Sequence, residues 1–511
     1  MSFLLNSINK VNETFRNAGS FNSEFGVFSG FTPIDVLSTI VNKSSECLDV
    51  DVMTSGPYPY PYTELGLSSV GKTTLWIQVI SSCIDNWYKY YGPVSECIFY
   101  SVEMHTTAQR WQDITGWDDK MMQERLRFIS KPWSITEIYN DIAVLAKNKI
   151  ACKKDLEIDT GIRSLDGSSF KTLPTTYVLI DSISSIRSKT ELQFDKEGNV
   201  KNGDTVGGTS NMDAMQIAKD NTLFINEVKK LCEEAKICII MINHLVEIPV
   251  LDRYNPPKPM LPGLKFNQKI KGGAELVYQS YGVGLLSIKE RMFNEKSKIY
   301  GDDIHGLISF METIKNKSGR EGVRLPMVFD SDTGYKPELT DFEILYTEGN
   351  YGVVGSPLAY KLAILPEVTF TRKTLLSKCH ENPLLARALC FTTRLYLLSK
   401  FVLNEEAPDL TTLMEAPLDT RIDMILRYSI DYPGYNNRGL FVSDEIIEGV
   451  RELNSQLNRF DSYNRLFDPA EAEFIKDDLL LTTDKFDFNN PECKIGETEY
   501  YTPVSDDTKW K

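Results

Sequence analysis

The chain has 511 residues, of which 42% are hydrophobic and 25% charged, and its net charge is −15. This composition is ordinary for a soluble globular protein with a large core and one or two smaller domains. We find neither an apolar run of about 18 residues, as a membrane span needs, nor the basic and apolar start of a signal peptide. The cysteines and histidines are scattered and lack metal-ligand spacing. Scattered cysteines are typical of a reducing compartment, so we expect a cytoplasmic protein, and without a membrane span we expect no interaction with a membrane.

The first predicted element is a short amphipathic helix near the N-terminus. Leu4, Ile8, Val11 and Phe15 recur at helical spacing, and Gly19 would end the helix. We expect residues 1–45 to form an N-terminal helical segment with a role in oligomerisation. It would dock either on the core of its own chain or on a neighbouring subunit.

A phosphate-binding pattern, Gly-x4-Gly-Lys-Thr, follows at residues 66–73. The glycines allow the backbone to bend so that successive N–H groups point at phosphate oxygens. Lys72 would neutralise the β- and γ-phosphates, Thr73 would reach Mg²⁺, and a helix beginning near Lys72 would add its positive end. The cofactors would therefore be ATP and Mg²⁺. The predicted cofactor-binding residues here are Gly66, Leu67, Ser68, Ser69, Val70, Gly71, Lys72, Thr73 and Thr74.

Two apolar segments that end in a carboxylate come after this loop. Residues 97–103 indicate a buried strand ending in Glu103, and residues 177–182 indicate a second one ending in Asp181-Ser182. Ligands of open parallel sheets bind at the carboxyl ends of the strands. We therefore predict that Glu103 is catalytic and activates the attacking water, whereas Asp181 supports the magnesium ion.

From residue 64 to about residue 346, short apolar strands alternate with helical segments. This alternation predicts an α/β domain with a mostly parallel, twisted sheet and helices on both faces. Residues 237–243 indicate another buried strand, followed by His244, and residues 282–288 and 307–314 indicate later strands.

Two long polar segments, at residues 188–209 and 245–271, interrupt the alternation. Loops of this length in a compact domain are usually functional or disordered. In the second, cations lie beside Tyr254 and Phe266, a combination that suits single-stranded nucleic acid but also occurs in solvated basic loops. The candidate DNA-binding residues in it are Arg253, Lys258, Lys265, Lys269 and Lys271.

The C-terminal part is helical at first and then acidic. Residues 360–404 have a helical pattern, and residues 469–511 have the composition of a mobile acidic tail. Residues 401–511 contain 24 Asp/Glu and 11 Lys/Arg, a net charge of −13, so the first 400 residues carry only −2. A nearly neutral core can present a basic groove, so the net charge does not exclude a nucleic-acid partner.

In their order and spacing, these motifs resemble the RecA family, and within it the phage UvsX-type recombinases, over about residues 30–400. The phosphate loop, the strand ending in Glu103, the step at Asp181 and the pair Asn243-His244 follow the family's order. Further on, Lys271-Gly272-Gly273 is similar to the end of the second DNA-binding loop. Lys315-Asn316-Lys317 is similar to the family's Lys-Asn-Lys, and residues 342–349 resemble the strand that closes the core.

The resemblance implies a RecA-like P-loop NTPase core at residues 46–358, a mainly helical domain at residues 359–468 and an acidic tail at residues 469–511. It implies a DNA-dependent ATPase that forms a helical filament on single-stranded DNA, with a ring as the alternative assembly. Such a filament pairs with homologous duplex DNA and works with mediator and single-strand-binding proteins in recombination and repair.

The resemblance also implies roles for individual residues. His244 would relay the state of the γ-phosphate to the second DNA loop, which Gly272 and Gly273 would close. Lys315 and Lys317 would be catalytic in trans, because they would reach the ATP of the neighbouring subunit.

Two other functions fit the same residues. The segment Ser101-Val102-Glu103-Met104 resembles DnaB-type replicative helicases, and Arg320 would suit a helicase arginine finger. Such hexameric helicases usually carry an N-terminal domain of a hundred residues or more, whereas about 60 residues precede this phosphate loop. The other alternative is a RecA-fold mediator that binds nucleotide without exchanging strands.

Overall fold

The structure is a computed structural model of the chain. It describes residues 25–27, 29–42, 52–163, 169–186, 209–249, 258–259, 261, 263–292, 299–301, 305–404, 406–407, 409–415, 418, 421 and 425. The predicted N-terminal helix, nearly all of the first long loop, Arg253, Tyr254 and the acidic tail lie outside these residues.

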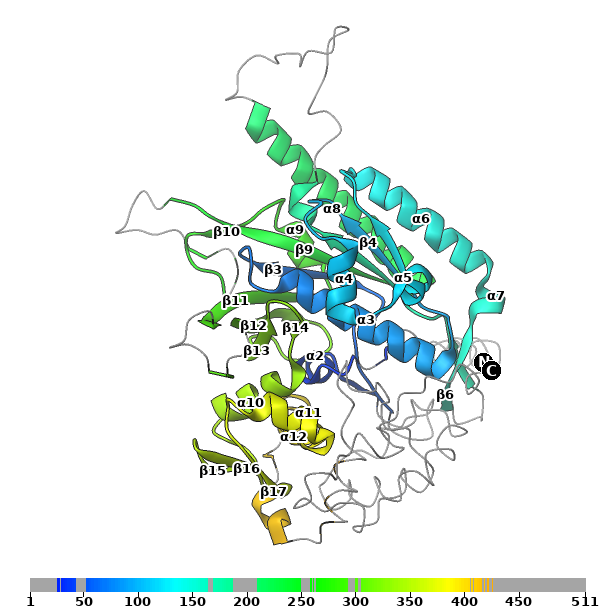
Figure 1. Cartoon of the computed structure of the whole chain (residues 1–511). Helices are drawn as coiled ribbons and strands as arrows, with labels where there is room; N and C mark the ends of the chain where they lie inside the picture. Colours follow the sequence, from blue (N-terminus) through cyan, green and yellow to red (C-terminus); the bar gives the residue numbers. More distant parts are fainter. Residues whose placement is uncertain are drawn as a thin grey trace, which may run out of the picture.

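A 10-stranded sheet forms the centre of the molecule (Figure 1). Across the sheet, the strands are β14 (Gly334–Tyr335), β13 (Arg324–Asp330), β12 (Gly306–Asn316), β11 (Gly282–Met292), β3 (Pro61–Gly66), β9 (Ile237–Glu247), β8 (Thr176–Asp181), β4 (Cys97–Ser101) and β5 (Leu126–Ile129), with β10 (Gln268–Ile270) paired to β9. From β11 to β5 neighbouring strands run parallel, whereas β12, β13, β14 and β10 pair antiparallel. This mixed, mostly parallel sheet confirms the predicted α/β class.

The side chains of each central strand alternate between two faces of the sheet. In β9, Ile240 packs in the core formed with α3 (Lys72–Tyr91), whereas Ile239 packs in a second core formed with α6 (Ile135–Ala151) and α8 (Thr209–Ala235). The alternation follows from the two-residue period of a strand. Because both faces are covered, the central strands are apolar along their length, as the sequence predicted. Figure 1 shows α3 on one side of the sheet and α6 and α8 on the other.

Shorter elements surround the sheet. These are the helices α4 (Ala108–Thr115), α5 (Asp119–Arg125), α7 (Lys153–Leu156) and α9 (Glu275–Gln279), and the paired strands β1 (Ile40–Asn42) with β2 (Val52–Thr54) and β6 (Ile158–Arg163) with β7 (Ser169–Thr172). Within the described ranges, we find no helix both long and apolar enough to cross a membrane.

The described part of the N-terminal segment packs on the core of its own chain. Its helix α2 (Thr32–Leu37) contacts α12 (Pro383–Leu397), and the Thr32 hydroxyl donates to Asp341 Oδ2 at 3.1 Å. Buried Asp35 accepts hydrogen bonds from the backbone and hydroxyl of Ser29 at 2.7 and 2.8 Å. The contacts of α2 with α12 and of Thr32 with Asp341 therefore connect the N-terminal segment to residues more than 300 positions later in the chain.

Residues 342–349 do not form the predicted closing strand. They belong mostly to the helix α10 (Pro337–Thr347), so that prediction is wrong. Pro337 at the first helical position and Glu338 in the first turn favour a helix start. Every residue from Pro337 to Leu345 is buried, including the acidic Glu338, Asp341 and Glu343, so the segment lacks the one-sided apolar pattern by which an amphipathic helix is recognised.

The helical prediction for residues 360–404 is correct only from Leu375 onward. Before it, β15 (Val353–Ser356), β16 (Ala359–Leu362) and β17 (Leu365–Phe370) form an antiparallel three-stranded sheet. Leu365, Val368 and Phe370 are the buried positions of β17, and short strands of this kind lack a strong sequence signal. The helices that follow are α11 (Leu375–Glu381) and α12. The pairing of β15 with β16 crosses the domain boundary expected at residue 358.

Candidate active site

The carboxyl ends of β3, β9, β8 and β4 meet at one edge of the sheet. The register pairs Gly66 of β3 with His244 of β9. The Val102 N–H donates to the Asp181 carbonyl at 2.8 Å, which holds the segment that contains Glu103 against the end of β8. Four strands therefore bring together residues that lie up to about 180 positions apart, at the edge where open sheets bind ligands.

The predicted phosphate loop joins β3 to α3. Gly71 has a φ of 97°, which favours glycine, and a Cβ there would also lie in tight contact, 3.1 Å, with the ring of Phe329. A Cβ at Gly66 would lie 2.7 Å from the carbonyl oxygen of Leu286. No side chain caps the start of α3, so the N–H groups of its first turn are available to an anion.

Lys72 is the buried cation of this loop. Its Nζ donates to the carbonyls of Gly66 at 3.0 Å and Leu67 at 2.7 Å. Burial lowers the pKa of Lys72 to about 8, against the opposing influence of the carboxylates Glu64 and Asp181. A phosphate beside the ammonium group would favour its charged form. The lysine thus fits the predicted contact with a triphosphate.

Glu64 is a buried residue near the phosphate loop, and its place in the site was not predicted from the sequence. The Trp76 indole N–H donates to Glu64 Oε2 at 3.2 Å, and within the described structure Oε1 is buried without a hydrogen-bond partner. Burial raises the pKa of Glu64 to about 8. In β11, a Cβ at Gly284 would lie 2.3 Å from Oε2, so this glycine makes room for the carboxyl. The available sequence signal was an acidic residue inside an apolar strand, two positions before the first loop glycine.

Thr73 and Asp181 lie together, as a magnesium site requires. The Thr73 hydroxyl donates to Asp181 Oδ2 at 3.0 Å. Burial raises the pKa of Asp181, and the hydrogen bond from Thr73 opposes this rise. Among the residues that the structure describes, no group of three or more His, Cys, Asp or Glu side chains could hold a metal. The hydroxyl and carboxylate pair fits Mg²⁺, which commonly takes its other ligands from phosphates and water.

The two carboxylate oxygens of Glu103 have different surroundings. Oε1 accepts hydrogen bonds from the Ser182 hydroxyl and, at 2.6 Å, from the Ser185 hydroxyl, and it lies 3.2 Å from His244 Nε2. Oε2 lies 3.4 Å from Nδ1 of the exposed His105. The hydrogen bond with His244, followed by those with the serines, holds the pKa of Glu103 well below its usual range. The carboxylate is therefore ionised at neutral pH, and Oε2 is the oxygen that lies beside His105 and not beside the serines.

His244 connects Glu103 to the end of the second long loop. The Lys271 N–H donates to the His244 carbonyl at 3.3 Å, and the Asn243 amide donates to the Lys271 carbonyl at 3.1 Å. Just beyond, β10 pairs with the last residues of β9. The strand β9 thus carries the side chain that contacts Glu103 and also pairs with the backbone that closes the loop. The sequence predicted His244 at this site but not the hydrogen bonds that connect it to the loop.

The described part of the second long loop carries exposed cations over an apolar anchor. Leu261, Leu264 and Ile270 are buried in a separate cluster that also contains residues of β3, β9 and β11. Phe266 is exposed, and at the end of the loop Gly272 and Gly273 have φ values of 82° and 101°. The exposed lysines are Lys258, Lys265, Lys269 and Lys271.

Lys315 and Lys317 do not join the site of their own chain. Through β11, the register places Lys315 at the level of Thr63 in β3. Gly66 is three residues further along, about 10 Å, and β3 is two strands away, about another 10 Å. These lysines therefore lie towards the opposite edge of the sheet from the phosphate loop that follows Gly66.

No family model matches the chain, and no curated protein matches it either. Functional inference therefore depends on the geometry of this site.

Proposed function

We propose that the chain is an ATP-dependent, DNA-binding recombinase of the RecA type, most similar to the phage UvsX-type proteins. It would assemble on single-stranded DNA in the cytoplasm, as a filament or a ring, and exchange strands with homologous duplex DNA, with mediator and single-strand-binding proteins as further partners. The observation that carries the proposal is one sheet edge at which a phosphate loop, the Thr73–Asp181 pair and the Glu103–His244 pair meet.

Each part of this edge has a separate task in ATP hydrolysis. Lys72 and the first-turn N–H groups of α3 would bind the β- and γ-phosphates, and Thr73 and Asp181 would hold Mg²⁺, which neutralises phosphate charge. Glu103 Oε2 would orient the attacking water and accept its proton, because Oε1 is already held by three side chains.

The same geometry supports a connection between nucleotide and DNA. His244 contacts Glu103, so loss of the γ-phosphate would change the surroundings of both side chains. The backbone of His244 is hydrogen bonded to Lys271 at the end of the basic loop. A rearrangement at the phosphate would thus reach the residues that we assign to DNA.

Arg320 offers little support to the helicase alternative. Its guanidinium donates to the side chain of Asn404 in its own chain, which engages the group that a helicase would extend to a neighbouring nucleotide.

The proposal is tested by measuring ATP turnover with and without single-stranded DNA, together with negative-stain microscopy in a slowly hydrolysed ATP analogue. We expect turnover that DNA stimulates, and helical filaments that need both DNA and nucleotide. Closed rings with directional unwinding of duplex DNA would favour the helicase. Isolated particles that bind nucleotide without exchanging strands would favour the mediator.

Glu103→Gln should bind ATP normally and lower turnover by about 10²-fold or more, because the amide keeps the shape of the side chain but cannot accept a proton. Single-turnover hydrolysis and the binding of a fluorescent ATP analogue separate the two effects. Glu124→Gln, on the exposed side of α5, is the matched control and should behave as wild type. Wild-type turnover in Glu103→Gln would leave Glu103 as a structural acid at the end of β4.

Neutralising the cations of the second long loop should weaken single-stranded DNA binding and flatten its salt dependence, because fewer counterions are released. Nucleotide binding without DNA should persist. Titrations at several salt concentrations measure the slope, and an unchanged slope would show that DNA binds elsewhere. The variant replaces Arg253, Lys258, Lys265, Lys269 and Lys271 by Gln, and the control replaces the exposed Lys120, Lys147, Lys153, Lys154 and Lys230.

A further inference from the structure

A third lysine lies beside Lys315 and Lys317. Lys229 of α8 donates its Nζ to the side chain of Gln279 in α9, and Lys315 donates to the carbonyl of the adjacent residue, Tyr278, at 2.5 Å. Lys317 follows two residues later in the chain. The ammonium groups of Lys229 and Lys315 thus meet at the end of α9, and the backbone N–H of Lys317 donates to the carbonyl of nearby Tyr281 at 3.3 Å. We call Lys229, Lys315 and Lys317 the lysine cluster.

The lysine cluster carries positive charge that its surroundings do not balance. Burial lowers the pKa of Lys315, and the charges of Lys317 and Lys229 lower it further. Burial and the charge of Lys317 likewise lower the pKa of Lys229. Within the described residues, none of the three lysines forms an ion pair, and Glu275 and Glu321 act on them only as more distant opposite charges. Partly buried cations that repel one another favour an anion between them.

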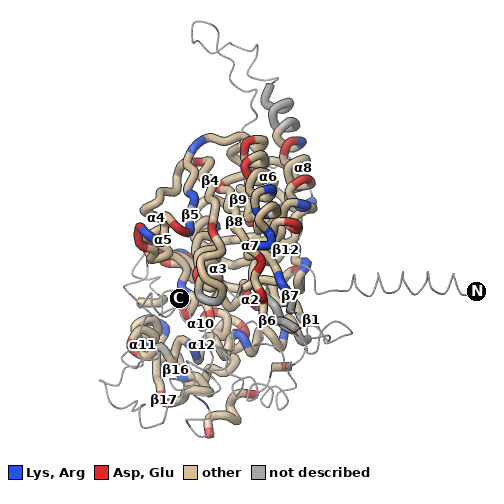
Figure 2. The backbone as a smooth tube through the Cα atoms, turned by 90° about the vertical axis from the view of Figure 1, so that its right-hand side faces the viewer, with Lys and Arg blue, Asp and Glu red and all other residues tan. Residues whose placement is uncertain are grey.

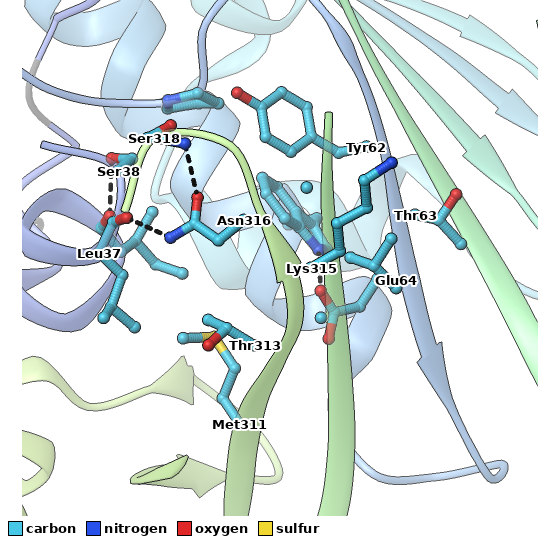
Figure 3. A pocket seen from close by; sticks show the side chains of 16 residues that line it. Leu37, Ser38, Tyr62, Thr63, Glu64, Met311, Thr313, Lys315, Asn316 and Ser318 are labelled. Carbon is cyan, nitrogen blue, oxygen red and sulfur yellow. Dashed lines mark hydrogen bonds between the residues drawn. The ribbon is translucent and has the colours of Figure 1, made fainter. Parts of the chain in front are cut away.

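The cluster occupies one side of the end of β12. Figure 3 shows Lys315 and Asn316 pointing to opposite sides of this strand. The Asn316 amide donates to the Leu37 carbonyl at 2.6 Å and so fixes the other side to the N-terminal segment. The side of β12 that carries Lys315 faces α9, and α9 packs on α8. Figure 2 shows charges of both signs along α8. The anion would therefore approach the surface formed by α8, α9 and the end of β12.

The phosphates for this surface must come from another molecule. The phosphate loop of the same chain lies beyond Gly66, about 10 Å further along the sheet and about 10 Å across it. The end of the basic loop, at Lys271, is hydrogen bonded to His244 of β9. His244 is level with Gly66 and not with the lysine cluster. A compact anion with several charges suits three neighbouring cations better than one phosphate of a DNA strand does. The triphosphate bound to a second copy is such an anion.

We infer that Lys229 contacts the triphosphate bound to a neighbouring copy of the chain, together with Lys315 and Lys317, and thereby helps to stabilise the charge that develops during hydrolysis. The inference rests on the proposed function and adds to it a residue on α8. In an assembly, each complete site would then combine the phosphate loop of one copy with β12 and α8 of the next.

Lys229→Ala should lower DNA-stimulated ATP turnover by about tenfold or more, as the removal of one stabilising donor does in other active sites. Lys229→Arg should retain most of the activity because it keeps the charge. Lys230→Ala is the matched control: Lys230 is the next residue on α8, is exposed, lies 3.8 Å from Glu234, and should give wild-type turnover. Circular dichroism and thermal unfolding of Lys229→Ala and Lys229→Gln should match wild type, which shows that the loss is not one of folding.

Mixing Lys229→Ala with Lys72→Ala protein tests the position of Lys229 across the interface. Junctions that pair an intact phosphate loop with an intact lysine cluster should recover turnover. The inference is overturned if Lys229→Ala equals Lys230→Ala, or if mixing restores nothing although mixed assemblies form. It is also overturned if the variant changes only the salt dependence of DNA binding, since Lys229 would then contact DNA phosphates. A wild-type protein without nucleotide turnover would instead refute the proposed function itself.

Discussion

Lys72→Ala is expected to abolish ATP turnover, to below about a thousandth of the wild-type rate. The ammonium group is buried at the start of α3, and it is the cation of the loop that would meet the β- and γ-phosphates. The change removes this charge from the position where negative charge develops in the transition state. Steady-state turnover at saturating ATP, with and without DNA, measures the loss.

The fold of Lys72→Ala should remain intact. Lys72 donates only to the loop carbonyls of Gly66 and Leu67, so its loss should change the free energy of unfolding by about 1 kcal/mol. Lys149 provides the contrast, because it is also a buried lysine but joins α6 to the start of β8 by donating to Pro174 and Thr176. Lys149→Ala should lower the free energy of unfolding by about 1–3 kcal/mol and leave ATP binding intact.

Chemical unfolding and ATP turnover of the two variants therefore give opposite patterns. Lys72→Ala should lose turnover and keep stability, whereas Lys149→Ala should lose stability and keep the nucleotide site. If Lys72→Ala hydrolyses ATP at the wild-type rate, the assignment of the phosphate loop is wrong.

The double variant Lys315→Ala with Lys317→Ala should lose DNA-stimulated turnover and stable filaments. In the register of the sheet, Lys315 lies about 10 Å along and about 10 Å across from Gly66, so we expect it to act on the nucleotide of a neighbouring subunit. An isolated subunit should therefore bind ATP as the wild type does. Equilibrium binding of a fluorescent ATP analogue to dilute protein measures this, and microscopy with DNA measures assembly.

Mixtures of this double variant with Lys72→Ala protein distinguish action in trans from a defect within one subunit. Each complete site would take its phosphate loop from one subunit and its lysines from the next. Junctions with both parts intact should regain turnover, although neither variant alone has any. A mixture that forms mixed polymers at several ratios but never recovers activity would count decisively against the trans role.

Features that depend on residues close together in the sequence could be predicted from the sequence alone. The candidate phosphate loop was predicted because phosphate binding of this kind needs glycines, a lysine and a threonine at set spacing in one continuous turn. The strands before Glu103, Asp181 and His244 were predicted because strands buried on both faces are apolar along their length. Since ligands of parallel sheets bind at the carboxyl ends of the strands, the sequence also predicted a ligand site at Glu103 and Asp181, whereas the role of His244 came from the family resemblance.

The remaining features were decided by packing between distant segments. Residues 342–347 are the end of helix α10, which is buried from Pro337 to Leu345, whereas β15, β16 and β17 are strands that pair with one another. The burial of Glu64, the serine contacts of Glu103 and the approach of Lys229 to Lys315 join elements far apart in sequence. Local pattern does not contain such contacts, because burial and electrostatic interaction depend on distances in space that only the folded chain establishes.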